Sequence, residues 1–356
     1  MPYGTVNADS LVSSDGGVIS PNINSLRNRI INGAMVIDQR NAGASITVNS
    51  NSGTQFAADR FLVQGTSSEG VFTAQQLSAT PPTGFKNYVR VQTTTASASP
   101  ASGSLYAMSQ IIEGFNIADL GFGAAGASTV TFSFWIRSSL TGTFSGSLKN
   151  GNAYNRSYPF TYTINSANTW EYKTVTVAGD TSGTWQTGNL GGLIVYWDLG
   201  CGSSLLSTAN SWQGGNYNGV TGSTRLISTL NATLDITGVQ LEKGSVATSF
   251  DYRPYGTELA LCQRYFRKTN GGVNTEPTLY AYGDGSQVIG QSWIFPVPMR
   301  VSPTTTTSGS LAIGNGGSPT ILVSPDSYFL YVMPSGGGTV YYQPNGSYRI
   351  SFSAEL

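Results

Sequence analysis

The sequence predicts an all-β protein made of two β-sandwich, jelly-roll-like domains joined by a short helix, with an extended segment at the N-terminus. Short segments rich in alternating or β-branched residues recur along the chain, and turns rich in glycine or proline separate them. Glycine accounts for 44 of the 356 residues, well above the roughly 7% usual in soluble proteins. Many short strands with such turns are typical of sandwiches rather than of alternating α/β folds.

The strands of the first domain are recognised by their periodicity. Residues 129–137 alternate strictly, which predicts a half-buried strand. One face of this strand carries only apolar side chains: Val130, Phe132, Phe134 and Ile136. Residues 172–177 are rich in β-branched side chains, and residues 193–197 are apolar on both faces, as expected of a central strand. Residues 232–236 alternate again, and Gly238 indicates a bulge.

Trp135 occupies the opposite face of the strand at 129–137. Three environments are compatible with this position. The ring faces a neighbouring subunit, lies under a covering segment, or lines a groove that binds a ligand.

The remaining elements divide the chain into four parts. Strands are expected at 328–333, 339–342 and 348–354, and helices at 257–266, with Thr257 as N-cap, and at 21–27. The parts are an extended N-terminal segment (1–28), a large β-sandwich (29–254), a helical linker (255–270) and a C-terminal sandwich (271–356).

Composition excludes several classes of function. Lysine plus arginine equal aspartate plus glutamate at 18 each, without the basic excess of a nucleic-acid binder. Histidine is absent, which excludes Ser-His-Asp and Cys-His hydrolase sites and His-ligated metals. Cys201 and Cys262 form one bridge at most, and the alternative is two buried thiols. No secretory signal opens the sequence, and no run of about 18 apolar residues predicts membrane insertion.

Five motifs resemble one family when taken together and in order. They are NRIINGAMVIDQR (28–40), FAADRF (56–61), GDTSGTW (179–185), GVQLEKG (238–244) and ATSFDYRP (247–254), and the last continues into residues 258–266. This combination resembles bacteriophage and prophage tail-fibre proteins, as does the C-terminal SAEL. The resemblance implies a homotrimeric virion fibre that is assembled in the host cytoplasm. It also implies that residues 29–254 form a jelly roll similar to carbohydrate-binding modules, and it says nothing of the region after Phe266.

Glycan binding by this fibre would require exposed aromatic rings beside amides and carboxylates. The long segment 198–224 offers four such residues: Trp212, Gln213, Asn216 and Tyr217. The alternative role of Trp212 is to hold this loop in place by packing. The C-terminal domain, dense in tyrosine, offers four more: Tyr280, Tyr282, Asp284 and Tyr341. Because an N-terminal anchor sets the polarity of a fibre, we expect host recognition at the C-terminal domain, with Trp212 and Tyr217 as the rival site.

The first 28 residues are expected to hold the fibre on a baseplate or tail protein. They carry scattered apolar positions without a core to bury them: Val6, Leu11, Val12, Val18 and Ile19. The partners expected are therefore a second and third copy of the chain, a virion protein and host surface polysaccharide. The alternative function is a purely structural baseplate, connector or capsid-associated protein.

Enzymatic activity and bound cofactors are not expected. A glycosidase needs two carboxylates about 5 to 9.5 Å apart, and the acidic residues beside aromatics occur singly: Glu171, Asp198 and Asp284. A structural calcium ion is an alternative, with Asp180, Asp198 and Asp235 as oxygen donors, although no Asp-x-Asp-x-Asp loop is present.

Overall fold

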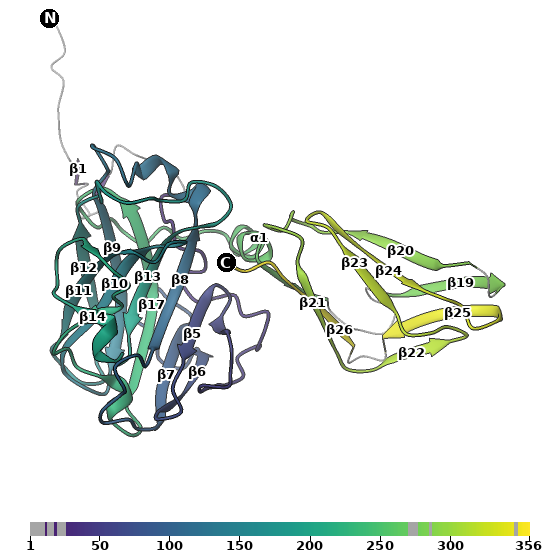
Figure 1. The fold of residues 1–356 in the computed structure, drawn as a ribbon, viewed down its shortest axis with the longest axis horizontal. Helices are drawn as coiled ribbons and strands as arrows, with labels where there is room; N and C mark the ends of the chain where they lie inside the picture. The colour runs from purple at the N-terminus through teal and green to yellow at the C-terminus, as the bar shows by residue number, and fades with distance from the viewer. Residues whose placement is uncertain (1–10, 13–17, 20–25, 270–276, 285–286, 345–347) are drawn as a thin grey trace, which may run out of the picture. The chain divides into compact units, whose positions relative to one another are not determined.

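The computed structural model describes residues 11–12, 18–19, 26–269, 277–284, 287–344 and 348–356. The chain divides into two compact units, Met1–Pro254 and Tyr255–Leu356, and each is described by itself. In Figure 1 the colours run from purple to green in the first unit and from green to yellow in the second. Strands dominate both units, and the described residues contain a single α-helix, α1 (Tyr255–Gln263). The predicted all-β class is confirmed.

The first unit contains a seven-stranded antiparallel sheet in the order β15-β11-β10-β13-β8-β5-β4. Its strands are β4 (Gln55–Ala58), β5 (Phe61–Gly65), β8 (Tyr106–Glu113), β10 (Gly142–Asn150), β11 (Arg156–Ile164), β13 (Gly191–Asp198) and β15 (Gln213–Gly214). β13 lies at the centre and is buried throughout, as its double-faced apolar pattern predicts.

A six-stranded antiparallel sheet, in the order β12-β9-β17-β7-β6-β3, forms the second layer. Its strands are β3 (Ile46–Val48), β6 (Val71–Leu77), β7 (Tyr88–Thr95), β9 (Val130–Ser138), β12 (Glu171–Val177) and β17 (Thr233–Lys243). The register of β17 against β9 shifts between Thr237 and Gln240, which confirms the bulge predicted at Gly238.

Aromatic rings from both sheets fill the space between them. The four apolar residues predicted on one face of β9 are all fully buried. Two of them, Phe132 and Phe134, contact Trp197 of β13, with ring centroids 5.3 and 5.6 Å apart. Strict alternation thus assigns one face of β9 to the core and leaves the other face outside.

Shorter elements complete the first unit. They are β1 (Leu11–Val12), β2 (Val18–Ile19), β14 (Leu206–Ser207), β16 (Gly219–Val220), and the 3₁₀ turns η1 (Gly114–Asn116), η2 (Ala118–Leu120), η3 (Ser203–Leu205) and η4 (Leu226–Ser228). β14 and β16 pair in parallel. The long segment 198–224 therefore contains structure of its own, because η3, β14, β15 and β16 lie within it.

The N-terminal segment is not wholly extended, since β1 pairs antiparallel with β2. This pair includes four of the anchor candidates: Leu11, Val12, Val18 and Ile19. Val6 lies outside the described residues, as does most of the helix expected at 21–27. The last two residues of that expected helix, Leu26 and Arg27, are not helical.

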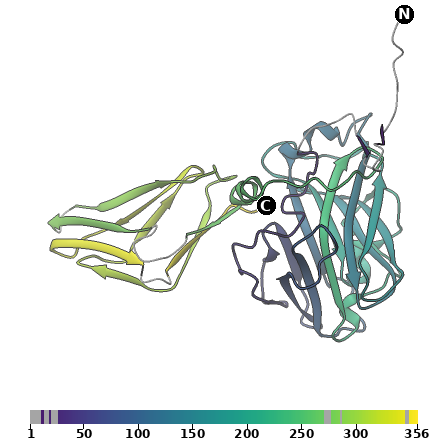
Figure 2. The same ribbon diagram turned by 180° about the vertical axis from the view of Figure 1, so that it is seen from behind.

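The second unit contains three small antiparallel sheets: β18-β26-β21, β19-β25-β22 and β20-β24-β23. Its strands are β18 (Phe266–Lys268), β19 (Leu279–Asp284), β20 (Ile289–Ile294), β21 (Thr304–Ser308), β22 (Leu311–Gly314), β23 (Thr320–Val323), β24 (Ser327–Val332), β25 (Gly337–Pro344) and β26 (Arg349–Ser353). The three strands predicted from the sequence are β24, β25 and β26, and each is the middle strand of its sheet. Figure 2 shows this unit from behind.

Helix α1 begins earlier and ends earlier than the pattern predicts. It starts at Tyr255, two residues before the expected N-cap Thr257, because Pro254 has the backbone geometry that suits the entrance of a helix. It ends at Gln263, and Phe266 instead pairs with Ser353 of β26. Among the described residues, no helix is long and apolar enough to cross a membrane.

Candidate functional site

The outer face of the six-stranded sheet carries an open groove of about 560 Å³. Five aromatic side chains line it: Phe85, Trp135, Tyr172, Phe250 and Tyr252. Between them lie the small or hydroxyl-bearing residues Ser133, Gly238, Ala247, Thr248 and Ser249.

Trp135 and Tyr172 form the part of the groove that rests on strands. They are register partners on β9 and β12, so both point away from the core, and their ring centroids lie 5.5 Å apart. Tyr172 is 42% exposed. The structure places Trp135 in the lining of this groove, and whether a ligand or a neighbouring subunit covers it stays a prediction.

Phe85, Phe250 and Tyr252 form a second aromatic group contributed by loops. Their ring centroids are 4.8 to 5.5 Å apart. Tyr252 is 57% exposed, and its hydroxyl donates to the Gly84 carbonyl oxygen over 2.7 Å. This bond joins two segments that are 168 residues apart in sequence.

Gly238 separates the two aromatic groups. Its φ is +61°, in the left-handed region that side chains other than glycine adopt at a cost. A Cβ atom here would lie 2.6 Å from Phe85 Cζ and 2.9 Å from Trp135 Cδ1. The bulge therefore lets both rings approach the same point of the backbone.

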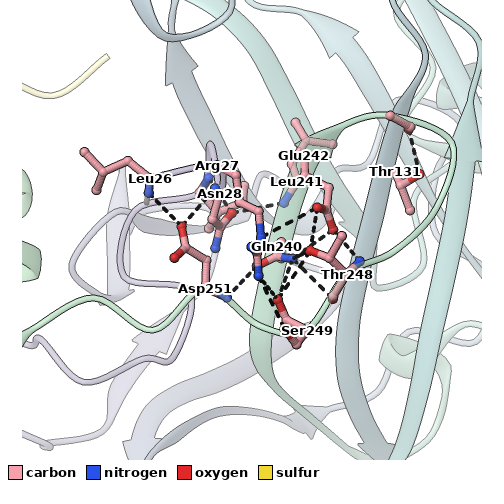
Figure 3. Close-up of polar contacts among 12 residues, drawn as sticks. Leu26, Arg27, Asn28, Thr131, Gln240, Leu241, Glu242, Thr248, Ser249 and Asp251 are labelled. Atoms are coloured by element: carbon pink, nitrogen blue, oxygen red, sulfur yellow. Dashed lines mark hydrogen bonds and ion pairs between the residues drawn. The ribbon is translucent and has the colours of Figure 1, made fainter. Parts of the chain in front are cut away.

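One wall of the groove is fixed by a buried polar network (Figure 3). Glu242 accepts from the backbone N–H of Thr248 at 2.9 Å and from its hydroxyl at 2.7 Å. The Gln240 amide donates to Glu242 over 2.8 Å and accepts from the Asp251 N–H over 2.8 Å. Gln240 and Glu242 are both buried, so the segment that carries Phe250 and Tyr252 is held at β17.

The same network secures the entry of the chain into the first unit (Figure 3). Arg27 donates to the Ser249 carbonyl over 2.6 Å, and the Leu26 and Asn28 N–H groups donate to Asp251 at 3.1 and 3.3 Å. The Asn28 amide then donates to the Val239 carbonyl at 3.0 Å. Three of the family-like motifs, at 28–40, 238–244 and 247–254, thus meet at one junction, where their role is structural.

The loop that carries Phe85 is held by a cluster around Thr80. Arg137 donates to the Thr80 hydroxyl over 2.9 Å, and the Trp170 indole donates to the Thr80 carbonyl over 2.8 Å. Asp235 accepts from both Arg137 and Arg90, and its hydrogen bond raises the pKa of Arg90. Both walls of the groove are therefore fixed by hydrogen bonds within the unit.

The chemistry of the groove is that of aromatic faces and hydroxyl groups. None of the described residues that line it is charged. The arrangement is suited to holding a ligand that presents apolar faces and hydroxyls.

The structure places Trp212, the first sequence-predicted glycan residue, in another aromatic cluster. Its ring centroid lies 5.4 Å from Tyr158, 5.5 Å from Trp185 and 5.9 Å from Phe122. Its indole N–H donates to the Ala178 carbonyl over 2.7 Å. These contacts match the alternative in which the tryptophan pins the loop.

Three other candidates from the same segment also make contacts within the unit. Gln213 donates to the Thr208 carbonyl over 2.6 Å, and Asn216 accepts from the Lys149 ammonium over 2.6 Å. The Tyr217 N–H donates to the Ser157 hydroxyl over 3.2 Å. The contacts to Lys149 and Ser157 hold the segment against β10 and β11 of the seven-stranded sheet.

Lys149, which the sequence analysis did not single out, lies beneath this segment. It is 1% exposed, donates to the side-chain oxygens of Asn216 and Asn218, and lies 4.1 Å from the centroid of the Tyr196 ring. Burial lowers the pKa of Lys149 to about 7. The sequence signal that could have identified Lys149 is its position on the outward face of a strand, among residues with small side chains.

The candidates of the second unit lie on β19 and β25. Tyr280 and Tyr341 are register partners, and Asp284 pairs with Gly337. Tyr282 is 79% exposed. The structure brings Tyr280 and Tyr341 side by side at the level of the backbone, and the part these residues play in binding stays a prediction.

The three carboxylates considered for calcium are each engaged separately. Asp180 accepts two hydrogen bonds from Arg156, Asp198 accepts from the Gly200 and Cys201 N–H groups, and Asp235 accepts from two arginines. Across the described residues, no group of three or more acidic or cysteine side chains gathers. Cys201 and Cys262 are buried thiols without a disulfide bond.

Comparisons with known proteins find weak structural likenesses. No family profile matches the sequence, and no curated protein matches it. The enzymatically active domain of bacteriophage CBA120 tailspike protein 4 matches 62% of this chain and 22% of its own, with 11% identity and a TM-score of 0.31. A CBM4 structure matches 60% and 98%, with 15% identity and a TM-score of 0.28. The family 11 carbohydrate-binding module of Clostridium thermocellum Lic26A-Cel5E matches 54% and 95%, with 11% identity and a TM-score of 0.28.

Each of these structures is similar to the chain with a TM-score of 0.31 or less. The matched region spans less than a quarter of the tailspike domain. The assignment of the first unit as a sandwich therefore depends on its own strand order and register.

Proposed function

We propose that the chain is a phage tail fibre that attaches to host surface glycans through the groove on its first unit, without catalysis. The observation that carries the glycan-binding part is an open groove lined by five aromatic rings and by no charged side chain among its described residues.

Sugar rings suit this groove for a physical reason. One face of a pyranose exposes mostly C–H groups, which gain free energy when an aromatic ring removes them from water. The exposed rings of Tyr172 and Tyr252 offer such faces, and the hydroxyls of Ser133 and Thr248 border the same space. Fixed walls reduce the entropy lost on binding.

The fibre part of the proposal depends on the motifs at 28–40, 56–61, 179–185, 238–244 and 247–254. The first 28 residues would attach to a baseplate or tail protein. A homotrimer would cover apolar side chains that the second unit exposes: Tyr282, Ile294, Leu322 and Met333.

The proposal moves the main recognition site from the C-terminal unit to the groove. Tyr282 remains the exposed candidate of the C-terminal unit. A comparison of the two sites is therefore part of the test.

The test is binding of the purified full chain to an array of bacterial surface polysaccharides. We expect Trp135→Ala and Tyr172→Ala each to weaken binding at least tenfold. Phe115→Ala is the matched control, because Phe115 is an exposed aromatic of the first unit that does not line the groove. Tyr282→Ala measures the contribution of the second unit.

Four outcomes decide the matter. Loss of binding in the groove variants alone supports the proposal, whereas loss in Tyr282→Ala alone moves recognition to the C-terminal unit. Absence of binding to any polysaccharide favours the structural baseplate or connector role. Release of reducing ends from a bound polysaccharide would contradict the non-catalytic part.

A further inference from the structure

We infer that the groove takes an internal stretch of at least two sugars from an uncharged polysaccharide, and that glycans rich in uronate or other acids are excluded. This inference rests on the proposed function, and it names the class of glycan.

Three arginines around the groove are already paired within the unit. Arg137 and Arg90 both bind Asp235, at 2.8 and 2.7 Å. Arg27 donates to the Ser249 carbonyl at 2.6 Å, and its Nε lies 3.8 Å from Glu242. Recognition of a carboxylate sugar normally uses an arginine or lysine that is available to the ligand.

The carboxylates of the wall add to this preference. Glu242 lies behind Thr248, and Asp251 lies between Phe250 and Tyr252 in the chain. Glu242 lies 3.8 Å from Arg27, so an acidic sugar in the groove would chiefly approach the negative charge of Asp251 while losing part of its hydration. Both effects disfavour an anion.

The two aromatic groups indicate the length of the ligand. Trp135 with Tyr172 and the loop group around Phe250 contribute separate rings on the two sides of Gly238. A volume of about 560 Å³ falls in the range of pockets that hold ligands larger than one sugar. Because the groove is open on the sheet surface, a polymer can extend beyond the sugars that it holds.

The experiment is titration calorimetry of the full chain with defined oligosaccharides. The neutral probes are cellohexaose, maltohexaose and mannohexaose, and the acidic probes are hexamers of alginate and polygalacturonate. We expect at least one neutral hexamer to bind at least tenfold more tightly than either acidic hexamer, and its monosaccharide to bind at least tenfold more weakly. Raising NaCl from 50 to 500 mM should change the neutral affinity less than twofold, since no ion pair is screened.

A gain-of-function variant makes the charge argument independent of the natural ligand. Ser249 is an exposed residue of the groove, so Ser249→Lys should raise the affinity for the acidic hexamers at least fivefold. Ser249→Gln is the matched control, with a long polar side chain and no charge.

The failures of the two proposals are distinguishable. If an acidic hexamer binds more tightly than every neutral one and Trp135→Ala abolishes that binding, the inference is wrong and glycan binding in the groove stands. If none of the probes binds, or if Trp135→Ala changes no affinity, the inference falls together with the proposed groove function.

Discussion

The two outer faces of the sandwich start from the same alternation and end in different environments. On the six-stranded sheet, Trp135 and Tyr172 point outward and line an open groove. On the seven-stranded sheet, the outward residues of β10 lie beneath the segment 198–224, and Lys149 is almost fully buried. Alternation along a strand determines which side chains point away from the core, and the neighbouring loops determine whether those side chains are exposed to water.

Side-chain size explains much of the difference. The covered face carries hydroxyl residues that bind the loop: Ser145 donates to Ser223 over 2.9 Å, and Ser157 donates to the Gly215 carbonyl over 2.8 Å. Such small side chains let a backbone approach the sheet. On the other face, the two large rings and the Gly238 bulge hold segments apart and leave a groove between fixed walls.

The largest expected effect is a loss of stability that distinguishes Trp212 from Trp135. Trp212→Ala should lower the free energy of unfolding by about 3 kcal/mol, because it removes a ring packed against three others. Denaturant unfolding measures this change, and glycan affinity should stay within twofold. Trp135→Ala should show the reverse, and a Trp212→Ala protein of full stability but weak binding would contradict the comparison.

The next effect concerns the buried amine of the covered face. The pKa of Lys149 is lowered from 10.5 to about 7 in the folded state, so between these values the unfolded chain binds more protons. The unfolding free energy is therefore highest above pH 10.5, where the amine is neutral in both states. It decreases as the pH falls toward 7, because the unfolded chain gains a proton that the folded protein does not. The difference in unfolding free energy between pH 7 and 9 should be about 2 kcal/mol.

Lys149→Met tests this pH dependence. The variant keeps an unbranched side chain and should remove the pH-dependent difference between 7 and 9, as measured by urea unfolding at both pH values. Lys173→Met is the control, because Lys173 also bonds within the first unit, at 2.6 Å to Glu171, but is not fully buried. An unchanged slope in Lys149→Met would show that the amine is solvated.

A pair of glycines sharpens the role of the bulge. Gly238 and Gly53 have nearly equal φ values of +61° and +62°, but a Cβ at Gly53 would meet nothing within 4 Å. Both alanine variants carry the same backbone cost, so the excess destabilisation of Gly238→Ala, about 1.5 kcal/mol, reports the crowding of Phe85 and Trp135. Thermal unfolding measures the pair. Equal melting temperatures would mean that the rings move aside easily.

The smallest expected effect is that of Tyr252→Phe. The variant keeps the ring and loses the hydroxyl that bonds to the Gly84 carbonyl, which should cost about 1 kcal/mol of stability or less. Glycan affinity should fall two- to fivefold, because the wall is less well fixed. Tyr255→Phe, at an exposed tyrosine that does not line the groove, should change neither quantity.

The sequence by itself determined the all-β class of this protein and the inward face of its clearest strands. Period-two alternation identified the core face of β9, the doubly apolar run identified β13 as central, and Gly238 identified the bulge. In the second unit, the three recognisable strands are the middle strands of their sheets, and two of them, β24 and β26, alternate between buried and partly buried positions. These features depend on local spacing, which the sequence carries directly.

Only the tertiary structure decided which outward residues form a site. Phe85, Trp135 and Phe250 are far apart in sequence, and hydrogen bonds through Thr80, Gln240 and Glu242 bring their segments to one sheet face. Trp212 is equally aromatic, yet it lies against other rings of the first unit. The physical reason is that exposure depends on long-range packing of loops, whereas alternation reports only the side of the sheet from which a side chain projects.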